Sequence, residues 1–369
     1  MVSGWDSGAE ILFAENFFSR PSGPPVGFLA ADRPVHGWTA DRREFLGEGG
    51  HADPEGLRRI GLGEVAGAGL DPCAALQVHM DLAPGESQTV RFFLGAAGAV
   101  EDARDVASAL RAPDAARERR EEAEGFWDEL LGRFTVKTPD PALDVLVDRW
   151  APYQALSSRI WGRSALYQSS GAFGFRDQLQ DVTAFLPTYP EIAREHILEA
   201  ARRQFEDGDV LHWWHPPHGA GIRSRCSDDL LWLPWTVAGY VEATGDLAIL
   251  EERAPYLEGP RLAPGEMERF GEYGPGPVEG SLYEHCARAL EKGMTSGPNG
   301  LPLIGSGDWN DGMDRVGRAG KGESVWLGWF VIDAATRFAE VCDRVGDEER
   351  ARSLRERSDV LRTNLEDFA

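Results

Sequence analysis

Residues 324–345 read SVWLGWFVIDAATRFAEVCDRV, a stretch in which apolar side chains recur near helical spacing. Six further stretches after residue 139 share this pattern: Pro141–Tyr153, Glu191–Phe205, Asp228–Thr244, Asp246–Ala254, Leu282–Met294 and Asp347–Phe368. Loops of Gly, Pro, Asp, His and Trp separate several of them, and no strand–helix–strand alternation is visible. Helices in succession, with the chemistry confined to the connecting loops, predict a mainly α protein with a helical barrel or bundle over residues 139–369.

The first 97 residues are predicted to be rich in β-structure. Short apolar or alternating runs at Ile11–Ala14, Ala75–Met80 and Gln88–Leu94 have the character of strands. A turn at Pro84–Glu86 precedes the last of these runs. Too few strands are visible for a complete sandwich of ordinary size, so we expect the C-terminal part of a larger β-sandwich.

Residues 98–138 are predicted to form a helical linker. Glu101–Arg111 and Pro113–Leu131 have the pattern of charged helices, and proline is well tolerated at a helix start. The run Arg117–Glu122 mixes both signs of charge, which is typical of a solvated helix face and not of a binding patch.

The composition excludes several classes of protein. The formal net charge is −23, whereas nucleic-acid binding demands clustered Lys and Arg. The 4 cysteines form no CxxC pair, so neither a zinc site nor a disulfide framework is predicted. The chain has no apolar run long enough to span a bilayer, and its first residues lack the pattern of a signal peptide. We therefore predict a cytoplasmic chain with no nucleic-acid partner and no membrane contact from this segment.

A glycine-bracketed loop, Gly305–Gly312, contains two carboxylates, an amide and an indole. Glycine lets a ligand approach the backbone closely, indole faces stack on sugar rings, and carboxylic acids protonate oxygens. Asp308, Trp309 and Asp311 therefore give this loop the character of a sugar site. The simpler interpretation is a polar turn in which Asp308 caps the next helix.

A second stretch with glycines, Tyr167–Asp181, places Arg176 beside Asp177 at a predicted helix start. A carboxylate accepts hydrogen bonds from hydroxyl groups and a guanidinium donates in a fixed fork, so this pair suits the vicinal hydroxyls of a sugar. The simpler interpretation is an internal ion pair with Asp177 as the N-cap.

Two neighbouring stretches, residues 207–218 and 227–232, combine tryptophans, histidines, prolines and carboxylates. The adjacent Trp213 and Trp214 are expected to form a rigid aromatic wall, although packing in the core is the simpler interpretation. Three histidines within seven residues suggest a metal, but their spacing fits no standard ligand pattern, and we predict none. Asp228 is expected to cap the helix that begins there.

A fourth stretch, Tyr283–Cys286, contains Glu284 and His285. Consecutive side chains on a helix diverge by about 100°, so His285 and Cys286 would not pair as a base and a thiol nucleophile. Glu284 and His285 are instead predicted to line a substrate pocket.

These motifs, in this order, resemble glycoside hydrolase family 94, the inverting sugar phosphorylases. The motifs that carry the resemblance are GFRDQ, HWWHPP, SDDLLWLP, YEHC and GSGDWNDGM, together with Gly37–Gly47 and Gly69–Cys73. The match is similar in character to the phosphorylase-like region of cyclic β-1,2-glucan synthases and to 1,2-β-oligoglucan phosphorylases, and it covers nearly the whole chain.

The resemblance implies a partial β-sandwich, a helical linker and an (α/α)6 barrel that looks truncated. The chain begins inside the sandwich and stops before the later barrel helices, where the family has further phosphate ligands, so we expect a fragment. A half-barrel would expose the apolar inner faces of its helices, and we expect isolated folding and activity to be impaired. The resemblance is also compatible with a homodimer and with membrane attachment of a longer parent protein.

The resemblance further implies that Asp311 is the general acid, and that Trp309, Arg176 and Asp177 hold the sugar in the −1 subsite. An inverting phosphorylase needs only one placed acid, because phosphate is already an anionic nucleophile. Asp311 must then be protonated near neutral pH, and we expect Trp309 and Asp308 to provide the apolar and anionic neighbourhood that this requires.

The implied reaction is phosphorolysis of β-linked glucooligosaccharides, most closely the β-1,2-linked ones, which releases α-glucose 1-phosphate with inversion. Inorganic phosphate is then a co-substrate, and no cofactor is implied. In a cyclic glucan synthase the reaction would control chain length. Cellobiose- and chitobiose-type members have an arginine before the GFRD run, where this chain has Ser169–Gly171, which leaves the phosphate site undefined. An inverting hydrolase and a non-catalytic glucan-binding module remain open as alternatives.

Overall fold

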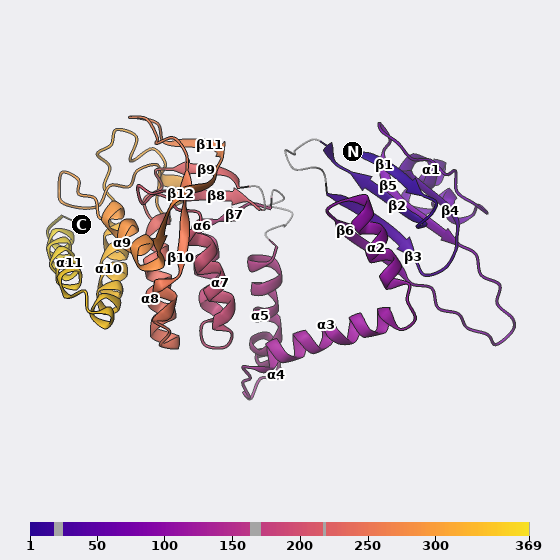
Figure 1. Ribbon diagram of the computed structural model, residues 1–369, viewed down its shortest axis with the longest axis horizontal. Coiled ribbons are helices and arrows are strands. Elements are labelled where there is room, and N and C mark those ends of the chain that lie inside the picture. The colour runs from indigo at the N-terminus through magenta and orange to yellow at the C-terminus, as the bar shows by residue number, and fades with distance from the viewer. Residues whose placement is uncertain (18–24, 163–170, 217–218, 369) are drawn as a thin grey trace. The chain divides into compact units, whose positions relative to one another are not determined.

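Contacts between residues divide the protein into two units, Met1–Trp127 and Asp128–Ala369. The computed structural model describes residues 1–17, 25–162, 171–216 and 219–368 (Figure 1). The first unit is rich in β-strands and the second is mainly helical, as the sequence predicts. The finer division into sandwich, linker and barrel stays a prediction.

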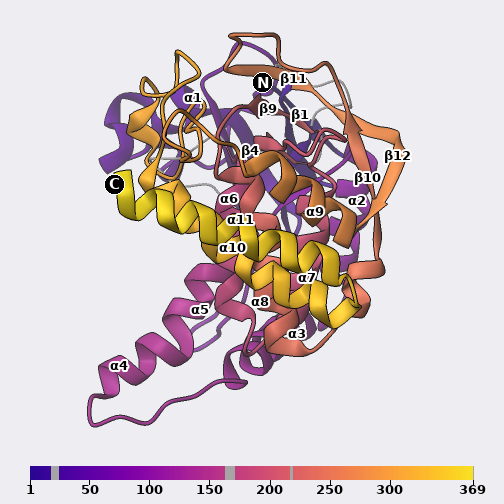
Figure 2. The same ribbon diagram turned by 90° about the vertical axis from the view of Figure 1, so that its left-hand side faces the viewer.

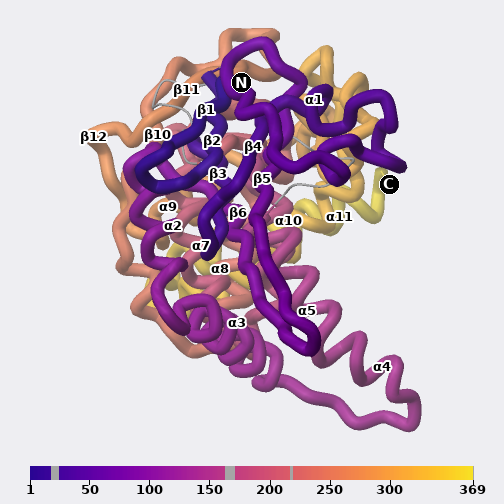
Figure 3. The backbone as a smooth tube through the Cα atoms, turned by 90° about the vertical axis from the view of Figure 1, so that its right-hand side faces the viewer, coloured from indigo at the N-terminus to yellow at the C-terminus, as the bar shows by residue number. Residues whose placement is uncertain are grey.

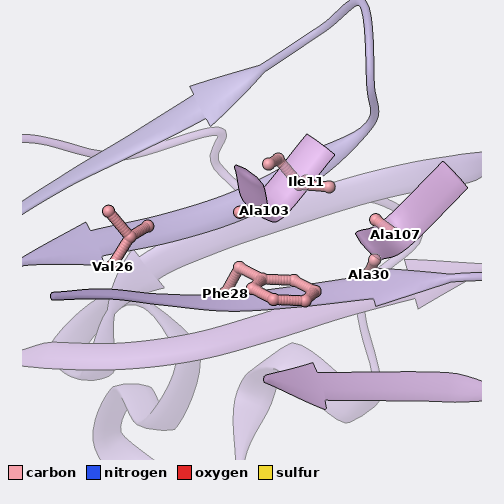
Figure 4. Packing of buried hydrophobic residues seen from close by; sticks show 6 residues of the cluster. All are labelled: Ile11, Val26, Phe28, Ala30, Ala103 and Ala107. Atoms are coloured by element: carbon pink, nitrogen blue, oxygen red, sulfur yellow. The ribbon is translucent and has the colours of Figure 1, made fainter. Parts of the chain in front are cut away.

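The first unit contains a four-stranded antiparallel sheet in the order β1–β2–β3–β6. Its strands are β1 (Val2–Asp6), β2 (Ile11–Glu15), β3 (Val26–Ala31) and β6 (Phe92–Ala97). Helix α2 (Val100–Leu110) packs on this sheet, because alternation along the strands directs one set of apolar side chains to one face. The buried cluster consists of Ile11, Val26, Phe28, Ala30, Ala103 and Ala107 (Figure 4).

A second, two-stranded sheet pairs β4 (Val35–Asp41) with β5 (Pro72–Val78), and the short helix α1 (Arg42–Leu46) follows β4 (Figure 3). The indoles of Trp5 and Trp38 connect the two sheets by stacking, with ring centroids 5.0 Å apart. A stacked aromatic pair of this kind contributes packing beyond its buried area.

The predicted strand Gln88–Leu94 begins later than expected, at Phe92. Side chains before it hydrogen-bond to nearby backbone, since Glu86 accepts from the amide of Ala83 and Gln88 donates to the carbonyl of Asp81. Such local bonds compete with strand pairing, which explains the shorter strand.

Helix α3 (Ala115–Gly132) has the exposed, charged face that the sequence predicts. Arg117 pairs with Glu121 over 3.0 Å and Arg120 pairs with Glu124 over 2.7 Å, each one helical turn apart. All four side chains are exposed, so these pairs contribute little to stability.

The second unit contains the α-helices α4 (Pro141–Val145), α5 (Ala151–Gln154), α6 (Phe175–Asp181), α7 (Pro190–Ala201), α8 (Trp232–Thr244), α9 (Leu282–Gly293), α10 (Val325–Val345) and α11 (Glu348–Phe368). Two π-helical segments, Leu146–Trp150 and Ala155–Ile160, follow α4 and α5 directly. Helices α10 and α11 lie side by side (Figure 2). The side chain of Leu365 occupies the space that Gly328 leaves open. Over the described residues, no helix combines the length and the apolar composition needed to cross a membrane.

Two small antiparallel sheets in the second unit were not predicted. One has the order β11–β9–β8–β7 and the other pairs β10 with β12. Their strands are β7 (Phe173–Gly174), β8 (Leu211–His215), β9 (Ala220–Ser224), β10 (Arg253–Glu258), β11 (Glu268–Glu272) and β12 (Gly274–Ser281). The prediction of a helix over Asp246–Ala254 is wrong: a 3-10 turn at Ala248–Glu251 leads directly into β10. Pro255 lies in this strand and disfavours the helical conformation of the residue before it.

Candidate active site

The glycine-bracketed loop is held against the segment that leads from β9 to α8. The amide of Ser306 donates to the carbonyl of Arg225 over 3.0 Å, and the amide of Ser227 donates to the carbonyl of Gly307 over 2.9 Å. Gly305 has a φ of +62°, and a Cβ there would lie 2.0 Å from the carbonyl oxygen of Arg225. This close approach therefore requires glycine, which explains one of the two glycines that flank the loop.

Arg176 gathers three segments at one point. It lies in the first turn of α6, and its side chain is only 11% exposed. Its guanidinium donates to Oδ2 of Asp228 over 3.3 Å, to the carbonyl of Asp308 over 3.3 Å and to Oδ1 of Asp311 over 2.9 Å. The structure thus brings together residues from two separate motifs of the sequence, Arg176 from one and Asp308 and Asp311 from the other.

Asp228 is the buried anchor of this arrangement. Its carboxylate is completely buried and also accepts from Nε1 of Trp232 over 3.0 Å and from Sγ of Cys226 over 3.3 Å. Burial and the neighbouring Asp229 raise the pKa of Asp228 to about 6. The prediction that Asp228 caps a helix is wrong, because its side chain makes no capping bond and points to Arg176 instead.

His212 and Asp229 form a second charged pair beside Asp228. Nδ1 of His212, on β8, lies 2.7 Å from Oδ2 of Asp229, which is 1% exposed. The Asp229 carboxylate raises the pKa of His212 to about 9, so the imidazole is cationic at neutral pH. Two buried carboxylates are therefore balanced by two cations, His212 and Arg176.

Asp308 holds the loop to the next helix. Its Oδ1 accepts from the amide of Asn310 over 2.8 Å and from Nδ2 of the same residue over 3.0 Å. Its Oδ2 accepts from the hydroxyl of Ser324, which in turn accepts from the amide of Leu327 over 3.0 Å. The interpretation of Asp308 as a helix cap is therefore wrong in detail, since Ser324 caps α10 and Asp308 fixes Ser324.

Asp311 and Trp309 lie in the exposed half of the loop, residues 309–312. The side chain of Asp311 is 73% exposed, and Trp309 is 49% exposed with its ring centroid 6.2 Å from that of Trp326. The expected anionic neighbourhood of Asp311 is not observed in the described part of the chain. The Asp308 carboxylate binds Asn310 and Ser324, while the neighbour of Asp311 is a cation, Arg176.

Among the described contacts, Asp177 and Arg176 have different partners. Its Oδ1 lies 3.5 Å from Nη2 of Arg159, whereas Arg176 contacts Asp228 and Asp311. The two side chains follow each other on a helix and diverge, so they do not act as a single fork here. The N-cap of α6 is Gly174, so the interpretation of Asp177 as the cap is wrong.

Trp213 and Trp214 do not form one continuous wall, because they follow each other on strand β8 and point to opposite faces. Trp214 is 2% exposed and packs near Phe173, with ring centroids 6.1 Å apart. Trp213 is half-buried and lies near His215 and Phe270. Trp214 is therefore a core residue, as the simpler interpretation held, and contact of Trp213 with sugar stays a prediction.

Glu284 and His285 are not brought to the loop. Glu284 forms a capping box with Ser281 at the start of α9. His285 is completely buried, where Nδ1 lies 2.7 Å from Oε1 of Gln204 and burial lowers its pKa to about 4. The structure gives both residues structural bonds, and no contact joins either of them to Arg176 or Asp311 within the described ranges.

The predicted absence of a metal stays a prediction. Of the three histidines, His212 pairs with Asp229, His215 lies against the ring of Trp213, and His218 lies outside the described residues. Ligand atoms of His212, Cys226 and Asp229 lie within 4.8 Å of one another. His212 pairs with Asp229 and Cys226 donates to Asp228, whereas Oδ1 of Asp229 has no hydrogen-bond partner among the described residues. The Ser169–Ser170 departure also lies outside the described residues.

Three residues of this site had no predicted role: His212, Asp229 and Ser324. The run Ser227–Asp228–Asp229 before an apolar helix offered a signal, because two adjacent carboxylates exceed what one cap requires. Ser324 has the sequence position of an N-cap, but its bond to Asp308 crosses from one segment to another. Pairing of this kind is visible only in the folded chain.

Comparison with known protein families shows the family to which this chain belongs. A model described as the catalytic domain of the glycosyl hydrolase 94 superfamily matches residues 126–369, and one described as the glycosyl hydrolase 94 supersandwich domain matches residues 1–113. The chain belongs to glycosyl hydrolase family 94. The resemblance carried by the sequence motifs is thereby confirmed, as is the order of a sandwich domain followed by a helical catalytic domain.

Named relatives of this family 94 chain include a synthase and phosphorylases. It is 44% identical over 372 residues to the cyclic beta-(1,2)-glucan synthase NdvB of Rhizobium meliloti, which covers 99% of the chain and 13% of the synthase. It is 32% identical to solabiose phosphorylase of Paenibacillus borealis, over 94% of the chain and 42% of that enzyme. It is 27% identical to 1,2-beta-oligoglucan phosphorylase of Listeria innocua, over 50% of the chain and 17% of that enzyme. The chain thus spans less than half the length of these relatives.

Proposed function

We propose that this region cleaves β-1,2-linked glucooligosaccharides with inorganic phosphate, with inversion, and releases α-glucose 1-phosphate. The observation that carries the proposal is the contact of Arg176 with Asp311 beside the exposed Trp309. An acid, a hydrogen-bonding fork and an aromatic face at one place suit a sugar ring and its leaving oxygen.

Phosphorolysis fits the number of available carboxylates better than hydrolysis. An inverting hydrolase needs a second carboxylate to activate water, whereas phosphate attacks without one. Asp228 and Asp308 are 0% and 1% exposed and are engaged in hydrogen bonds. In the cluster around Arg176, as far as the structure describes it, Asp311 is the one carboxylate open to a substrate.

Arg176 has to exchange partners when the sugar binds. In the free protein, its guanidinium donates a hydrogen bond to Asp311. Hydroxyl groups of the sugar accept from Arg176 in its place, and Asp311 turns to the glycosidic oxygen. The sugar ring, stacked on Trp309, excludes water from Asp311 and favours the neutral acid that protonates the leaving group.

The relatives support the proposed linkage and biological role. Identity of 44% to a cyclic beta-(1,2)-glucan synthase favours β-1,2-linked substrates over β-1,4-linked ones. In such a synthase, phosphorolysis of chain ends would control chain length before cyclisation. Phosphate is a co-substrate in this scheme, and a homodimer and a cytoplasmic location are part of the proposal.

The test compares products with and without phosphate. The chain, and the complete product of the gene that encodes it, are incubated with β-1,2-glucooligosaccharides, and products are identified by NMR. We expect α-glucose 1-phosphate, formed only with phosphate and lost in Asp311→Asn. Asp314→Asn is the matched control, because Asp314 is an exposed acid just after this loop and its one described partner is Arg318, at 3.6 Å.

Two outcomes would contradict the proposal. Free glucose at a rate independent of phosphate would indicate an inverting hydrolase. Binding of the glucan by the complete gene product without any cleavage, at every phosphate concentration, would indicate a glucan-binding module.

A further inference from the structure

A cavity of about 690 Å³ lies behind the segment that supports the candidate active site. Its wall includes Gly305 of the loop, and Cys226 and Ser227 of the segment that holds the loop. Arg176, Asp228, Trp309 and Asp311 do not line it. The cavity is therefore separate from the sugar site but shares a wall with it.

The lining of this cavity is basic, in a chain whose net charge is −23. Five cationic side chains line it: Arg223, Arg225, Arg261, Lys292 and Arg318. Two carboxylates, Asp207 and Asp209, lie among them, so the formal charge of the lining is 5 − 2 = +3. A concave site with an excess of one charge attracts ligands of the opposite charge.

Three of these cations are engaged in structural bonds. Arg223 is 2% exposed and binds Asp209 through two nitrogens, at 2.7 and 2.8 Å. Arg261 pairs with Asp207. Arg225 donates to the carbonyls of residues 262, 263 and 266 and so fixes the loop that covers the cavity.

Lys292 and Arg318 are the cations available to a ligand. No described residue forms a hydrogen bond or ion pair with Lys292, which lies in the last turn of α9. Arg318 is 64% exposed, and its one described partner, Asp314, is also exposed and 3.6 Å away. An exposed pair at this distance is weak and can be exchanged for a ligand.

The chemistry of the lining favours a small anion over a neutral sugar. None of the described residues that line the cavity is aromatic, whereas the candidate active site has Trp309. Gly317, Gly320 and Gly322 form part of the wall, and glycine allows a ligand to approach the backbone closely. A phosphate group accepts several charge-assisted hydrogen bonds from lysine and arginine.

We propose that this cavity binds a phosphate group, free or carried by a sugar, with Lys292 and Arg318 as its charge partners. The site is distinct from the one where phosphate attacks in the proposed reaction, and its existence does not depend on that reaction. Gly317, next to Arg318, lies so close to Gly305 that a Cβ there would be 1.9 Å from the Gly305 carbonyl oxygen. Binding at Arg318 therefore stabilises the two ends of the segment that contains Trp309 and Asp311.

The experiment measures binding of inorganic phosphate, glucose 1-phosphate and glucose by calorimetry on the 369-residue chain, at constant ionic strength. We expect both phosphates to bind and glucose not to bind at this site. Lys292→Gln/Arg318→Gln should weaken phosphate binding at least about tenfold, which corresponds to about 1.4 kcal/mol. Arg119→Gln/Arg120→Gln on α3 removes the same charge from exposed positions and should bind like the unaltered chain.

Further variants separate this site from the active site and from effects on folding. Lys292→Arg/Arg318→Lys keeps both charges and should retain binding. Asp311→Asn should also retain it, even if it abolishes phosphorolysis. Tighter binding of glucose 1-phosphate than of inorganic phosphate would identify a sugar phosphate as the ligand, and equal binding would identify the free anion. Equal affinity of the unaltered chain and of Lys292→Gln/Arg318→Gln, or no binding of either phosphate to the unaltered chain, would overturn the proposal.

Discussion

Arg176 and Asp311 lie 135 residues apart in the sequence, yet Nη2 of Arg176 donates to Oδ1 of Asp311 over 2.9 Å. The same guanidinium reaches Asp228, which is completely buried, over 3.3 Å. Arg176 thus links Asp311, which is exposed to a substrate, to Asp228, which is buried away from it. The direction of the guanidinium fork toward a sugar therefore depends on the charge of Asp228.

Glucan binding should weaken as the pH falls through about 6. Burial and Asp229 raise the pKa of Asp228 to about 6, so Asp228 gains a proton there and no longer attracts Arg176 as an anion. We expect roughly tenfold weaker binding at a pH of about 5 than at about 7.5, or about 1.4 kcal/mol. Calorimetric titration with a β-1,2-glucooligosaccharide measures this difference.

Asp228→Asn provides the control for this pH dependence. The variant should bind weakly at both pH values, because it lacks the titrating anion at each of them. Asp314→Asn should keep the dependence of the unaltered chain. A pH dependence in Asp228→Asn as steep as in the unaltered chain would show that another group is responsible.

Stability should fall between a pH of about 6.5 and about 9 because of His212. The folded state raises the pKa of His212 from 6.5 to about 9, so it binds the proton more tightly than the unfolded state does. The stabilisation is complete below 6.5 and is lost as the pH rises through 9. The shift corresponds to at most about 3 kcal/mol, and urea unfolding at several pH values measures it.

His212→Gln should remove this slope in the free energy of unfolding. His215→Gln is the matched control, because His215 lies on the same strand but its ring lies against Trp213. If His212→Gln and His215→Gln lost stability with pH equally, the ion pair with Asp229 would not be the cause.

The long helices could be predicted from the sequence because their packing leaves a local pattern. Helices α10 and α11 begin and end within one residue of their predicted bounds, since apolar residues recur along each of them. Strand β12, with the sequence GPGPVEGS, has no such pattern, and its pairing with β10 is a contact between distant segments. Sheets of this kind depend on tertiary pairing more than on propensity.

The candidate site, likewise, could be predicted only where its residues leave a local pattern in the sequence. Glycines and an indole marked the loop with Asp311, and Arg176 stood out at a helix start. Asp228 was interpreted as a helix cap, because a carboxylate just before an apolar helix satisfies that local rule. Its contact with Arg176 spans 52 residues, and no local rule reveals which cation a buried carboxylate will meet.

Ser324→Ala should destabilise the protein more than the loss of an ordinary cap. The hydroxyl of Ser324 accepts from the amide of Leu327 and donates to the buried Asp308. Loss of a cap costs about 1 kcal/mol, and an unsatisfied buried acceptor adds about 1–3 kcal/mol, so we expect about 2–4 kcal/mol. Urea unfolding measures the change in the free energy of unfolding.

Ser281→Ala is the comparison for this cap. Ser281 caps α9 and accepts from the amide of Glu284, and no buried carboxylate among the described residues binds its hydroxyl. We expect a loss of only about 1 kcal/mol there. Ser324→Thr keeps the hydroxyl and should recover most of the stability. Equal losses in Ser324→Ala and Ser281→Ala would mean that the bond to Asp308 adds nothing.

Trp309→Ala should weaken binding of the glucan without unfolding the chain. The indole is 49% exposed at the loop, so its truncation removes a sugar-stacking face and little of the core. We expect a loss of about 1–2 kcal/mol, or roughly tenfold or more in affinity, and Trp309→Phe should recover part of it.

Trp329→Ala is the control, because Trp329 is 45% exposed on the nearby helix α10 and lies 6.0 Å from the guanidinium of Arg362 rather than at the loop. Calorimetry with the same glucooligosaccharide compares the three variants, and equal affinities of Trp309→Ala and Trp329→Ala would remove Trp309 from the sugar site.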